Sequence, residues 1–447
     1  WDGEAWTEKP SVPGADPPAR AAHSLAFDAA RGVTVLFAGC CTEADEQLQD
    51  TWSWDGLGWT EEAPAGPRPP ARDAYAMSFD LARGVTVVAG GHSPELAGDE
   101  STQLNDTWEW DGQAWSERTP RQASPEARSR HTLVHDMARG EAVLVGGSPY
   151  NDEDGPLEDQ WAWDGVSWTQ RQPPGPLPVG RYAHAAVYDE ARGVQVLFGG
   201  SPVPWSSGVD SMGDCVSEGG SAEACLFHLQ DLWESDGEAW VQPAAGGWPL
   251  PQAREAHAMA YDPHRGVTVL FGGSTADCHA PIYTDTPWEG VVACEPGEAE
   301  PYVSYEAVFD GTWEWDGATW TPHALYEGPD DRWQHAMAHD ANRGVTVLFG
   351  GYTGESSGDT WEWDGESWVE VEPDNPLPVP RYGHSMFYDP QRKLSVLFGG
   401  EGEIVEECFE DEVESWCSVE SEYYSDTWLW DGQTWTEAVP LGPHKPG

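Results

Sequence analysis

Lysine is almost absent from this 447-residue sequence, which contains only Lys9, Lys393 and Lys445. Asp and Glu together number 78, Lys and Arg together 22, and the formal net charge at pH 7 is −56. Because so many negative charges repel phosphate groups, we expect neither nucleic acid nor an anionic membrane surface as a partner. Such an acidic protein suits dissolved cations, a cationic partner or solubility in salty water, and we favour the last interpretation.

Long apolar runs and metal-binding cysteine motifs are also missing. No stretch approaches the length of a membrane span, so no membrane insertion is expected. No Cys-x-x-Cys or His-x-x-His spacing indicates a zinc site. There is no signal peptide, and because the chain opens at Trp1 within a motif, we take it as a processed or truncated form.

Eight cysteines are present, and their positions predict local disulfide bonds. Six of them fall within three segments, which gives the predicted pairs Cys215–Cys225, Cys278–Cys294 and Cys408–Cys417. Cys40 and Cys41 are adjacent, so a vicinal disulfide, two free thiols and pairing elsewhere all stay open. An even number of cysteines paired within loops is typical of an oxidising compartment, and we expect a secreted or cell-surface protein.

The sequence is rich in Trp, Gly and Pro, with 27, 50 and 37 residues. Trp argues against disorder, because indole rings gain much from burial, and Gly and Pro favour short strands joined by turns. A nine-residue phrase, RGVTVLFGG, begins at Arg265 and again at Arg343. Near-copies begin at Arg31, Arg83, Arg139, Arg192 and Arg392.

The phrase belongs to a longer unit that contains an Arg, a His (once a Tyr), an Asp, a second Arg and the apolar run. The seven units are Arg20/His23/Asp28/Arg31, Arg72/Tyr75/Asp80/Arg83, Arg128/His131/Asp136/Arg139, Arg181/His184/Asp189/Arg192, Arg254/His257/Asp262/Arg265, Arg332/His335/Asp340/Arg343 and Arg381/His384/Asp389/Arg392. Each unit closes on a motif of the form DTWxWDGxxW. Each therefore predicts four short strands, with tight turns at DxxRG and at Asp-Gly.

Seven such units predict an all-β fold, a seven-bladed β-propeller with four antiparallel strands in each blade. The spacing of the double glycine, the aromatic strand and the final Trp resembles the kelch repeat, whose propellers include the galactose oxidase-like family. The resemblance covers Arg20 to Trp435 and implies that the RxxH strand is innermost and the final Trp strand outermost. It is similar to secreted kelch proteins of bacterial type.

The sequence predicts a single domain over residues 1–447. The expected blades span about residues 20–63, 72–119, 128–172, 181–243, 254–323, 332–371 and 381–438. Residues 1–8, WDGEAWTE, are an eighth copy of the closing hairpin. They can add an extra closing strand, displace the similar segment 427–437 or belong to a preceding blade, and the sequence does not distinguish these three possibilities.

Residues that occur in every unit are expected to build the blade, since a catalytic site needs one constellation and not seven. We therefore interpret the six RxxH histidines as scaffold residues hydrogen-bonded to neighbouring backbone, not as a metal ring. The repeated Arg and Asp residues are expected to form blade-to-blade or turn-fixing ion pairs. The Trp residues are expected in the core and between blades.

Function is expected in the segments that vary, above all Ser201–Gln230, Ser274–Phe309 and Glu401–Ser425, which open with the Pro-rich loops on one face. Residues directly after the first Arg and after Gly-Gly should line the mouth of the central channel. The candidate ligand-binding residues are Tyr182, Trp333, Tyr352, Tyr382, His92, Asp73, Glu255 and Glu401. Aromatic faces beside carboxylates suit a carbohydrate or a cationic ligand, and rim aromatics covered by their own loops are the alternative.

We thus expect a secreted, non-enzymatic propeller that binds a carbohydrate, a protein or a cationic ligand. One alternative is a copper oxidase of galactose oxidase-like type, although no copper ligands can be assigned by matching motifs. Another is a segment of a self-assembling surface protein. Asp152 and Asp154 are candidate calcium ligands, with a solvated acidic loop as the preferred interpretation, and no other cofactor is expected.

Overall fold

The structure of the protein is a computed structural model. It describes residues 16–40, 47–64, 66–93, 102–120, 123–149, 155–171, 175–202, 229–243, 250–273, 311–323, 328–372, 377–410 and 415–438. Within these residues there is no helix, and hence none long and apolar enough to cross a membrane. Residues 1–8 lie outside the described part of the chain, so their predicted role as an extra strand stays a prediction.

The described strands form seven four-stranded antiparallel sheets, the blades, in chain order. Blade 1 consists of β1 (Ser24–Asp28), β2 (Val33–Gly39), β3 (Leu48–Trp54) and β4 (Trp59–Glu62), and blade 2 of β5 (Ala76–Asp80), β6 (Val85–Ala89), β9 (Thr107–Trp110) and β10 (Trp115–Glu117). Blade 3 consists of β12 (Thr132–Asp136), β13 (Glu141–Val145), β15 (Gln160–Trp163) and β16 (Trp168–Arg171), and blade 4 of β17 (Ala185–Asp189), β18 (Val194–Phe198), β19 (Leu232–Ser235) and β20 (Trp240–Val241).

Blade 5 consists of β21 (Ala258–Asp262), β22 (Val267–Phe271), β23 (Thr312–Trp315) and β24 (Trp320–His323). Blade 6 consists of β25 (Ala336–Asp340), β26 (Val345–Tyr352), β27 (Ser356–Trp363) and β28 (Trp368–Val371), and blade 7 of β29 (Ser385–Asp389), β30 (Leu394–Phe398), β33 (Thr427–Trp430) and β34 (Trp435–Glu437). The predicted all-β, seven-bladed propeller with four antiparallel strands per blade is confirmed.

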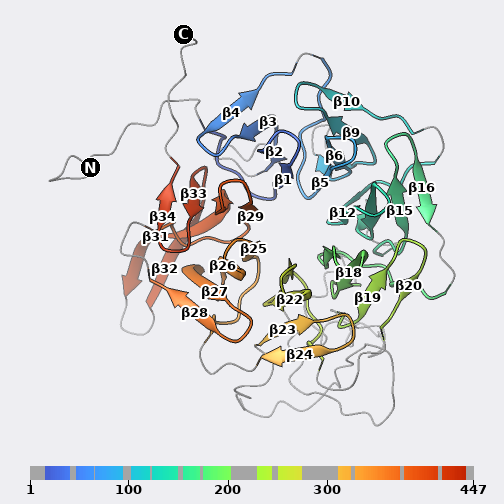
Figure 1. The fold of residues 1–447 in the computed structure, drawn as a ribbon. Helices are drawn as coiled ribbons and strands as arrows, with labels where there is room; N and C mark the ends of the chain where they lie inside the picture. The colour runs from blue at the N-terminus through green and yellow to red at the C-terminus, as the bar shows by residue number, and fades with distance from the viewer. Residues whose placement is uncertain are drawn as a thin grey trace, which may run out of the picture.

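The blades stand in a ring, with the RxxH strand of each blade innermost and the final Trp strand at the rim (Figure 1). Each inner strand contacts the next one around the ring, and the contact between β29 and β1 closes it. All four described strands of blade 7 come from the C-terminal part of the chain, and the Gly400 N–H donates to the carbonyl of Arg20 across this closure at 3.2 Å. Side chains add to the contact. The Trp59 ring lies 5.2 Å from Phe398, and its indole N–H donates to Thr427 Oγ1 at 2.6 Å.

The same Trp-to-Thr bond recurs around the ring. Trp115 of blade 2 donates to Thr51 Oγ1 of blade 1 at 2.8 Å, and Trp168 donates to Thr107 at 2.7 Å. Two blades differ at this position. Blade 3 has Gln160, whose Oε1 accepts the indole N–H of Trp240 at 3.0 Å, and blade 4 has Leu232, an apolar side chain on which the facing Trp320 packs. The predicted position of the Trp residues, between blades, is confirmed.

We expect Thr51→Val to destabilise the propeller by about 1–2 kcal/mol, because the buried N–H of Trp115 loses its acceptor. Thr86 is a matched control, since its side chain is equally buried but its hydroxyl has no hydrogen-bond partner. Thr86→Val should be neutral or slightly stabilising. Urea unfolding of both variants measures the difference, and equal costs would contradict the role of the Trp–Thr bond.

The RxxH histidines are packing groups between blades. Their rings meet a Phe of the preceding blade edge-on, at centroid distances of 5.2–5.6 Å in four interfaces. The prediction that they hydrogen-bond to neighbouring backbone is wrong. Both ring nitrogens lack a partner in His23, His131, His257, His335 and His384, and His184 Nε2 lies 3.0 Å from a side-chain oxygen, Thr132 Oγ1. Carbonyl groups such as that of Ala89 lie beside some rings without forming a normal hydrogen bond. The cause is the close fit of the flat ring against the preceding blade.

The first Arg of each unit is buried and joins strands of its own blade, so the predicted blade-to-blade or turn-fixing role is wrong at this position. Arg72 illustrates it: the guanidinium donates to both carboxylate oxygens of Asp106, at 2.7 and 2.6 Å, and to the carbonyl of Gly90 at 2.8 Å. Asp106 also accepts the indole N–H of Trp108 at 2.8 Å. This bidentate pair connects the start of the inner strand to the start of the third strand.

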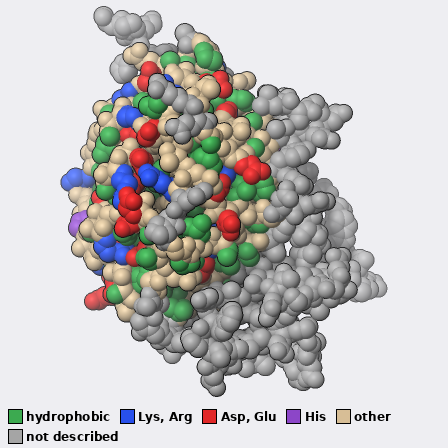
Figure 2. Space-filling view, turned by 90° about the vertical axis from the view of Figure 1, so that its right-hand side faces the viewer, with side chains coloured by type: hydrophobic (Ala, Val, Ile, Leu, Met, Phe, Trp, Pro, Cys, Tyr) green, Lys and Arg blue, Asp and Glu red, His purple; other side chains and the backbone are tan. Residues whose placement is uncertain are grey.

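The second Arg does have both predicted roles. Arg83 pairs with Asp80 at 2.7 Å within the DxxRG turn. Arg31 donates across to blade 2, to the carbonyl groups of Gly84 at 2.9 Å and of Asp111, and Arg392 of blade 7 donates likewise to Asp55 of blade 1. Because these Arg residues reach the surface, the described surface mixes basic and acidic side chains (Figure 2). It is less uniformly anionic than composition suggests.

Three pairs of strands lie outside the blades: β7 (His92–Ser93) with β8 (Thr102–Gln103), β11 (Arg128–Ser129) with β14 (Ser148–Pro149), and the longer β31 (Glu401–Glu410) with β32 (Ser415–Tyr423). The last pair is a hairpin at the outer side of blade 7 (Figure 1), where only a loop was expected from the sequence. Its register places Cys408 opposite Cys417, as their predicted pairing requires.

Cys40 is disulfide-bonded. The side chains of Cys41, Cys408 and Cys417, and the whole of the four other cysteines, lie outside the described residues. The predicted pairs Cys215–Cys225, Cys278–Cys294 and Cys408–Cys417, and the vicinal Cys40–Cys41 bond, therefore stay predictions. The calcium candidates Asp152 and Asp154 also lie outside the described residues.

Candidate functional site

The two sets of positions that were predicted to line the channel mouth are paired in the structure. The residue after the first Arg forms an antiparallel bridge with the residue after Gly-Gly of the same blade. The bridges outside named strands are Ala21–Cys40, Asp73–His92, Tyr182–Ser201, Trp333–Tyr352 and Tyr382–Glu401. Each bridge caps the end of the blade at which the inner strand begins, so the unique side chains of the candidate site lie on one face.

Three of the four predicted aromatic residues form one continuous row across blades 6 and 7. The rings of Trp333 and Tyr352 lie 5.4 Å apart at an interplanar angle of 66°. The rings of Tyr352 and Tyr382 lie 5.3 Å apart at 80°. Edge-to-face contacts of this kind fix the rings relative to one another. Trp333 is 37% exposed, which is unusual for Trp in this protein, and leaves an aromatic face open at the mouth.

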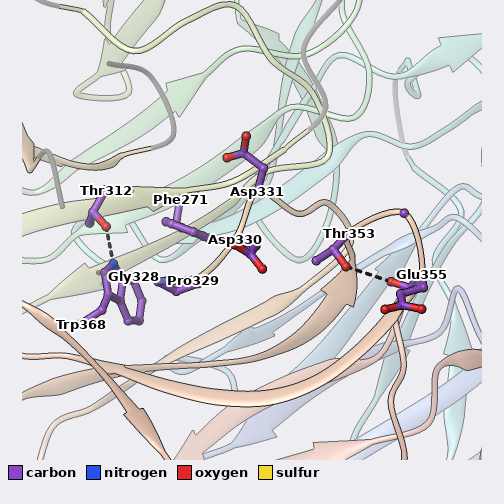
Figure 3. A pocket seen from close by; sticks show the side chains of 10 residues that line it. Phe271, Thr312, Gly328, Pro329, Asp330, Asp331, Thr353, Glu355 and Trp368 are labelled. Carbon is purple, nitrogen blue, oxygen red and sulfur yellow. Dashed lines mark hydrogen bonds between the residues drawn. The ribbon is translucent and has the colours of Figure 1, made fainter. Parts of the chain in front are cut away.

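A cavity of 740 Å³ adjoins this row between blades 5 and 6. Phe271 and Trp368 line one end of it, Thr353 and Glu355 the other, and Asp330 lies between them (Figure 3). A smaller cavity of 180 Å³ shares Asp331, Thr353 and Gly354 with it and reaches Trp333 and Tyr352. The two cavities together lead from the interface between blades to the aromatic row.

The lining of these cavities carries an excess of negative charge. Asp330, Asp331 and Glu355 line the larger cavity. Arg332 lines the smaller one, but its guanidinium is buried and bound to both carboxylate oxygens of Asp359. Burial alone would raise the pKa of Asp359, whereas the hydrogen bonds and charge of Arg332 lower it below its usual value. Asp359 thus stays ionised and neutralises the charge of Arg332.

The remaining predicted residues lie apart from the aromatic row. In blade 2, Asp73 lies 3.4 Å from His92 Nδ1, and Gln47 contacts both. Tyr182 in blade 4 is buried, with the Arg130 guanidinium 6.0 Å from its ring centre. Further around the same face, Glu255 is half-buried next to Arg254, which lines the smaller cavity. The residues of Ser274–Phe309 lie outside the described part of the chain.

Sequence reasoning missed the acidic residues of the cavity. Asp330 and Asp331 precede the first Arg of blade 6, and Glu355 follows its Gly-Gly pair by four positions. The sequence prediction included only the residues directly after the first Arg and directly after Gly-Gly. A wider search of the same two segments, GPDDRW and GGYTGE, would have found all three, because both segments approach the mouth from the same blade.

Residues 2–200 match the family model described as the KLHDC2/KLHL20/DRC7 Kelch-repeats domain. The match covers the first three blades and the two inner strands of blade 4. Over these residues the chain is similar to kelch repeats, and blades 5 to 7 carry the same repeated motif beyond the match. The class that the structure defines is the seven-bladed β-propeller. Comparison with curated proteins gives no match.

Proposed function

We propose that this propeller is a binding protein that holds a cationic segment of a partner protein, an Arg or Lys side chain, at the mouth between blades 5 and 7. The single observation that carries the proposal is the row of Trp333, Tyr352 and Tyr382, with Trp333 exposed, beside a cavity lined by acidic residues. Binding of proteins is the general role that a kelch propeller suggests. Nothing in the proposal requires a catalytic step.

A guanidinium or ammonium group fits this surface for two reasons. The open face of Trp333 attracts a cation through its ring quadrupole, which is worth about 0.5–2 kcal/mol. Asp330 and Asp331 place carboxyl groups in the lining of the cavities that lead to it. The cavity of 740 Å³ has the size of a site for a side chain and its neighbours. The acidic net charge favours encounter with a basic partner.

We expect Trp333→Ala to weaken binding of an Arg-rich peptide by about 5- to 30-fold, from loss of the cation–π contact. Leu81→Ala is the control, because Leu81 is exposed in the β5–β6 turn on the opposite face. Titration calorimetry at low and high salt measures both variants. A peptide with Arg replaced by citrulline, which has the same shape without the charge, should bind weakly to the wild-type protein.

Two results would contradict the proposal: equal affinity for the charged and uncharged peptides, or an unchanged affinity in Trp333→Ala. A neutral glycan in the same titrations tests the carbohydrate hypothesis, and strong glycan binding that Trp333→Ala removes would replace the cationic ligand. Secretion is a further part of the proposal, supported by the even number of cysteines and the disulfide at Cys40. Self-assembly stays a prediction, which sedimentation tests.

A further inference from the structure

Blades 5 and 6 depart from the repeat at two positions that meet on the face opposite the mouth. His264 occupies the turn position that holds Ala30, Ala82, Ala138 and Ala191 in blades 1 to 4. His339 occupies the position before the repeated Asp, where blades 4, 5 and 7 have Tyr188, Tyr261 and Tyr388. The two histidines are 75 positions apart in the chain and meet across the interface between blades.

We propose that Asp262, His264 and His339 form a binding site for a divalent transition metal ion of the Zn²⁺ type. They are the one group of three such ligand side chains found among the described residues. His264 Nδ1 lies 3.5 Å from His339 Nε2. Asp262 Oδ1 lies 3.4 Å from His339 Nε2 and 4.0 Å from His264 Nδ1. Tetrahedral ligands at about 2.0–2.1 Å from zinc are about 3.3–3.4 Å apart, so small adjustments admit the ion.

Asp262 Oδ1 has room for a third contact although it already accepts two backbone N–H groups, from His264 at 2.8 Å and Arg265 at 3.1 Å. The equivalent oxygen of Asp136 shows where the contact comes from: it accepts two backbone N–H groups and, at 3.1 Å, the hydroxyl of Tyr188. Asp262 belongs to blade 5, and in the following blade 6 His339 occupies the position of this Tyr. A metal ion between Asp262 and His339 would take the place of the Tyr hydroxyl.

The second nitrogen of His339 has a partner that orients the ring. His339 Nδ1 lies 3.2 Å from Thr346 Oγ1, whose side chain is buried. With the ring proton on Nδ1 and donated to Thr346, the lone pair of Nε2 faces His264 and Asp262. Metal-bound histidines commonly have such a hydrogen bond on the nitrogen away from the metal. Thr86 and Thr268, at the same position in other blades, have no partner for their hydroxyls.

Local charge and access also suit a cation. Asp262 pairs with Arg265, and Arg265 pairs in turn with Glu314, so the two carboxylates exceed the one guanidinium by one negative charge. The side chains of Asp262 and His339 are almost completely buried, whereas that of His264 is 53% exposed. An ion and a water ligand can therefore approach from the side of His264.

Zn²⁺ is the probe, and the titration is carried out in millimolar Mg²⁺, which occupies surface carboxylates. Titration calorimetry should then show one saturable Zn²⁺ site per chain. His264→Ala and His339→Tyr restore residues that other blades carry, so both variants should fold. Each should weaken Zn²⁺ binding more than about 100-fold, since it removes one of three ligands. Zn²⁺ should raise the melting temperature of the wild type and of neither variant.

His135→Tyr is the matched control, because His135 stands before Asp136 in blade 3 and the turn of blade 2 has Ala82 where the turn of blade 5 has His264. It should bind Zn²⁺ as tightly as the wild type. The proposal is overturned if the wild type shows no saturable site, or if Zn²⁺ binding survives in His264→Ala. Should His339→Tyr fail to fold, the exposed His264 alone decides, since its substitution leaves the core untouched.

Discussion

On acidification from about pH 7 to about pH 5, the propeller is expected to lose on the order of 10 kcal/mol of stability and to unfold. The reason is the set of buried RxxH rings. Burial lowers the pKa of these histidines, and a neighbouring Arg lowers it further, from 6.5 to about 3 in His23, His131, His184, His335 and His384. The pKa of His257 is also well below 6.5.

The sign follows from where the protons bind. Below the unfolded-state pKa of 6.5, the unfolded chain takes up a proton at each histidine and the folded protein does not, so falling pH favours unfolding down to the folded pKa of about 3. At about pH 5 each ring then costs about 2 kcal/mol. Summed over six rings, this cost is comparable to the whole free energy of unfolding of a typical domain.

Carboxylates act partly against this effect. Burial and Glu437 raise the pKa of Asp16 to about 6, so its protonation stabilises the folded state as the pH falls. Most other acids titrate only near pH 4, where relief of their mutual repulsion comes too late to protect the fold. The loss between pH 6.5 and 5 is therefore assigned to the histidines.

Circular dichroism against pH, with urea titrations at each pH, measures this loss. The slope of stability against pH should correspond to the uptake of about six protons on unfolding. His131→Tyr, which introduces the residue that blade 2 carries as Tyr75, should reduce the uptake by about one. Unchanged stability down to about pH 4 would show that the rings are protonated within the folded protein.

Gly146→Ala is expected to cost about 2–5 kcal/mol, the second large effect. Gly146 is the first glycine of the pair in blade 3 and has a φ of +65°. An added Cβ would lie 2.6 Å from the carbonyl oxygen of Arg181 and 3.2 Å from the His184 ring, both in blade 4. The backbone oxygen cannot rotate away, so the interface between the blades must widen. Left-handed backbone strain adds to this cost.

Gly140→Ala separates the two causes within the same blade. Gly140 has nearly the same φ, +67°, but an added Cβ would meet only the Ala82 methyl group at 3.7 Å. This variant should lose only about 1 kcal/mol, the strain of the left-handed backbone. Blade 1 has Ala38 at the position of Gly146, with a φ of +51°, and there the facing residue is Tyr75 instead of a histidine. Equal unfolding midpoints for the two variants would exclude the contact between blades as the cause.

Near-repetition made the scaffold predictable. Because every unit carries the same turn, glycine and Trp signals, one alignment of the seven copies predicts the number of blades, the order of strands and the face that carries the unique residues. The β31–β32 hairpin was not predicted, because its strands occur in one blade only and are not part of the repeat. The sequence predicted a blade-to-blade or turn-fixing ion pair for the first Arg, yet Arg72 pairs with Asp106 in the third strand region of its own blade. Each unit has one Asp in the DxxRG turn and another at the start of the DTW motif, and the spacing of the motifs does not say which of them the Arg side chain reaches.

The candidate site was predictable residue by residue but not as a group. The sequence proposed Trp333, Tyr352 and Tyr382 together with Tyr182, and only the structure separates the first three, which touch, from the fourth, which is buried. The cluster of Asp262, His264 and His339 was not predicted, since no local pattern joins a turn in one blade to a strand in the next.

Local periodicity, which repeats in the chain, was enough to predict the fold class, the framework residues and the mouth as the place of variation. It did not predict which unique residues become neighbours in the folded ring. Such contacts depend on how a rigid ring turns one blade against the next, and that rotation brings together side chains whose separation in the chain carries no signal.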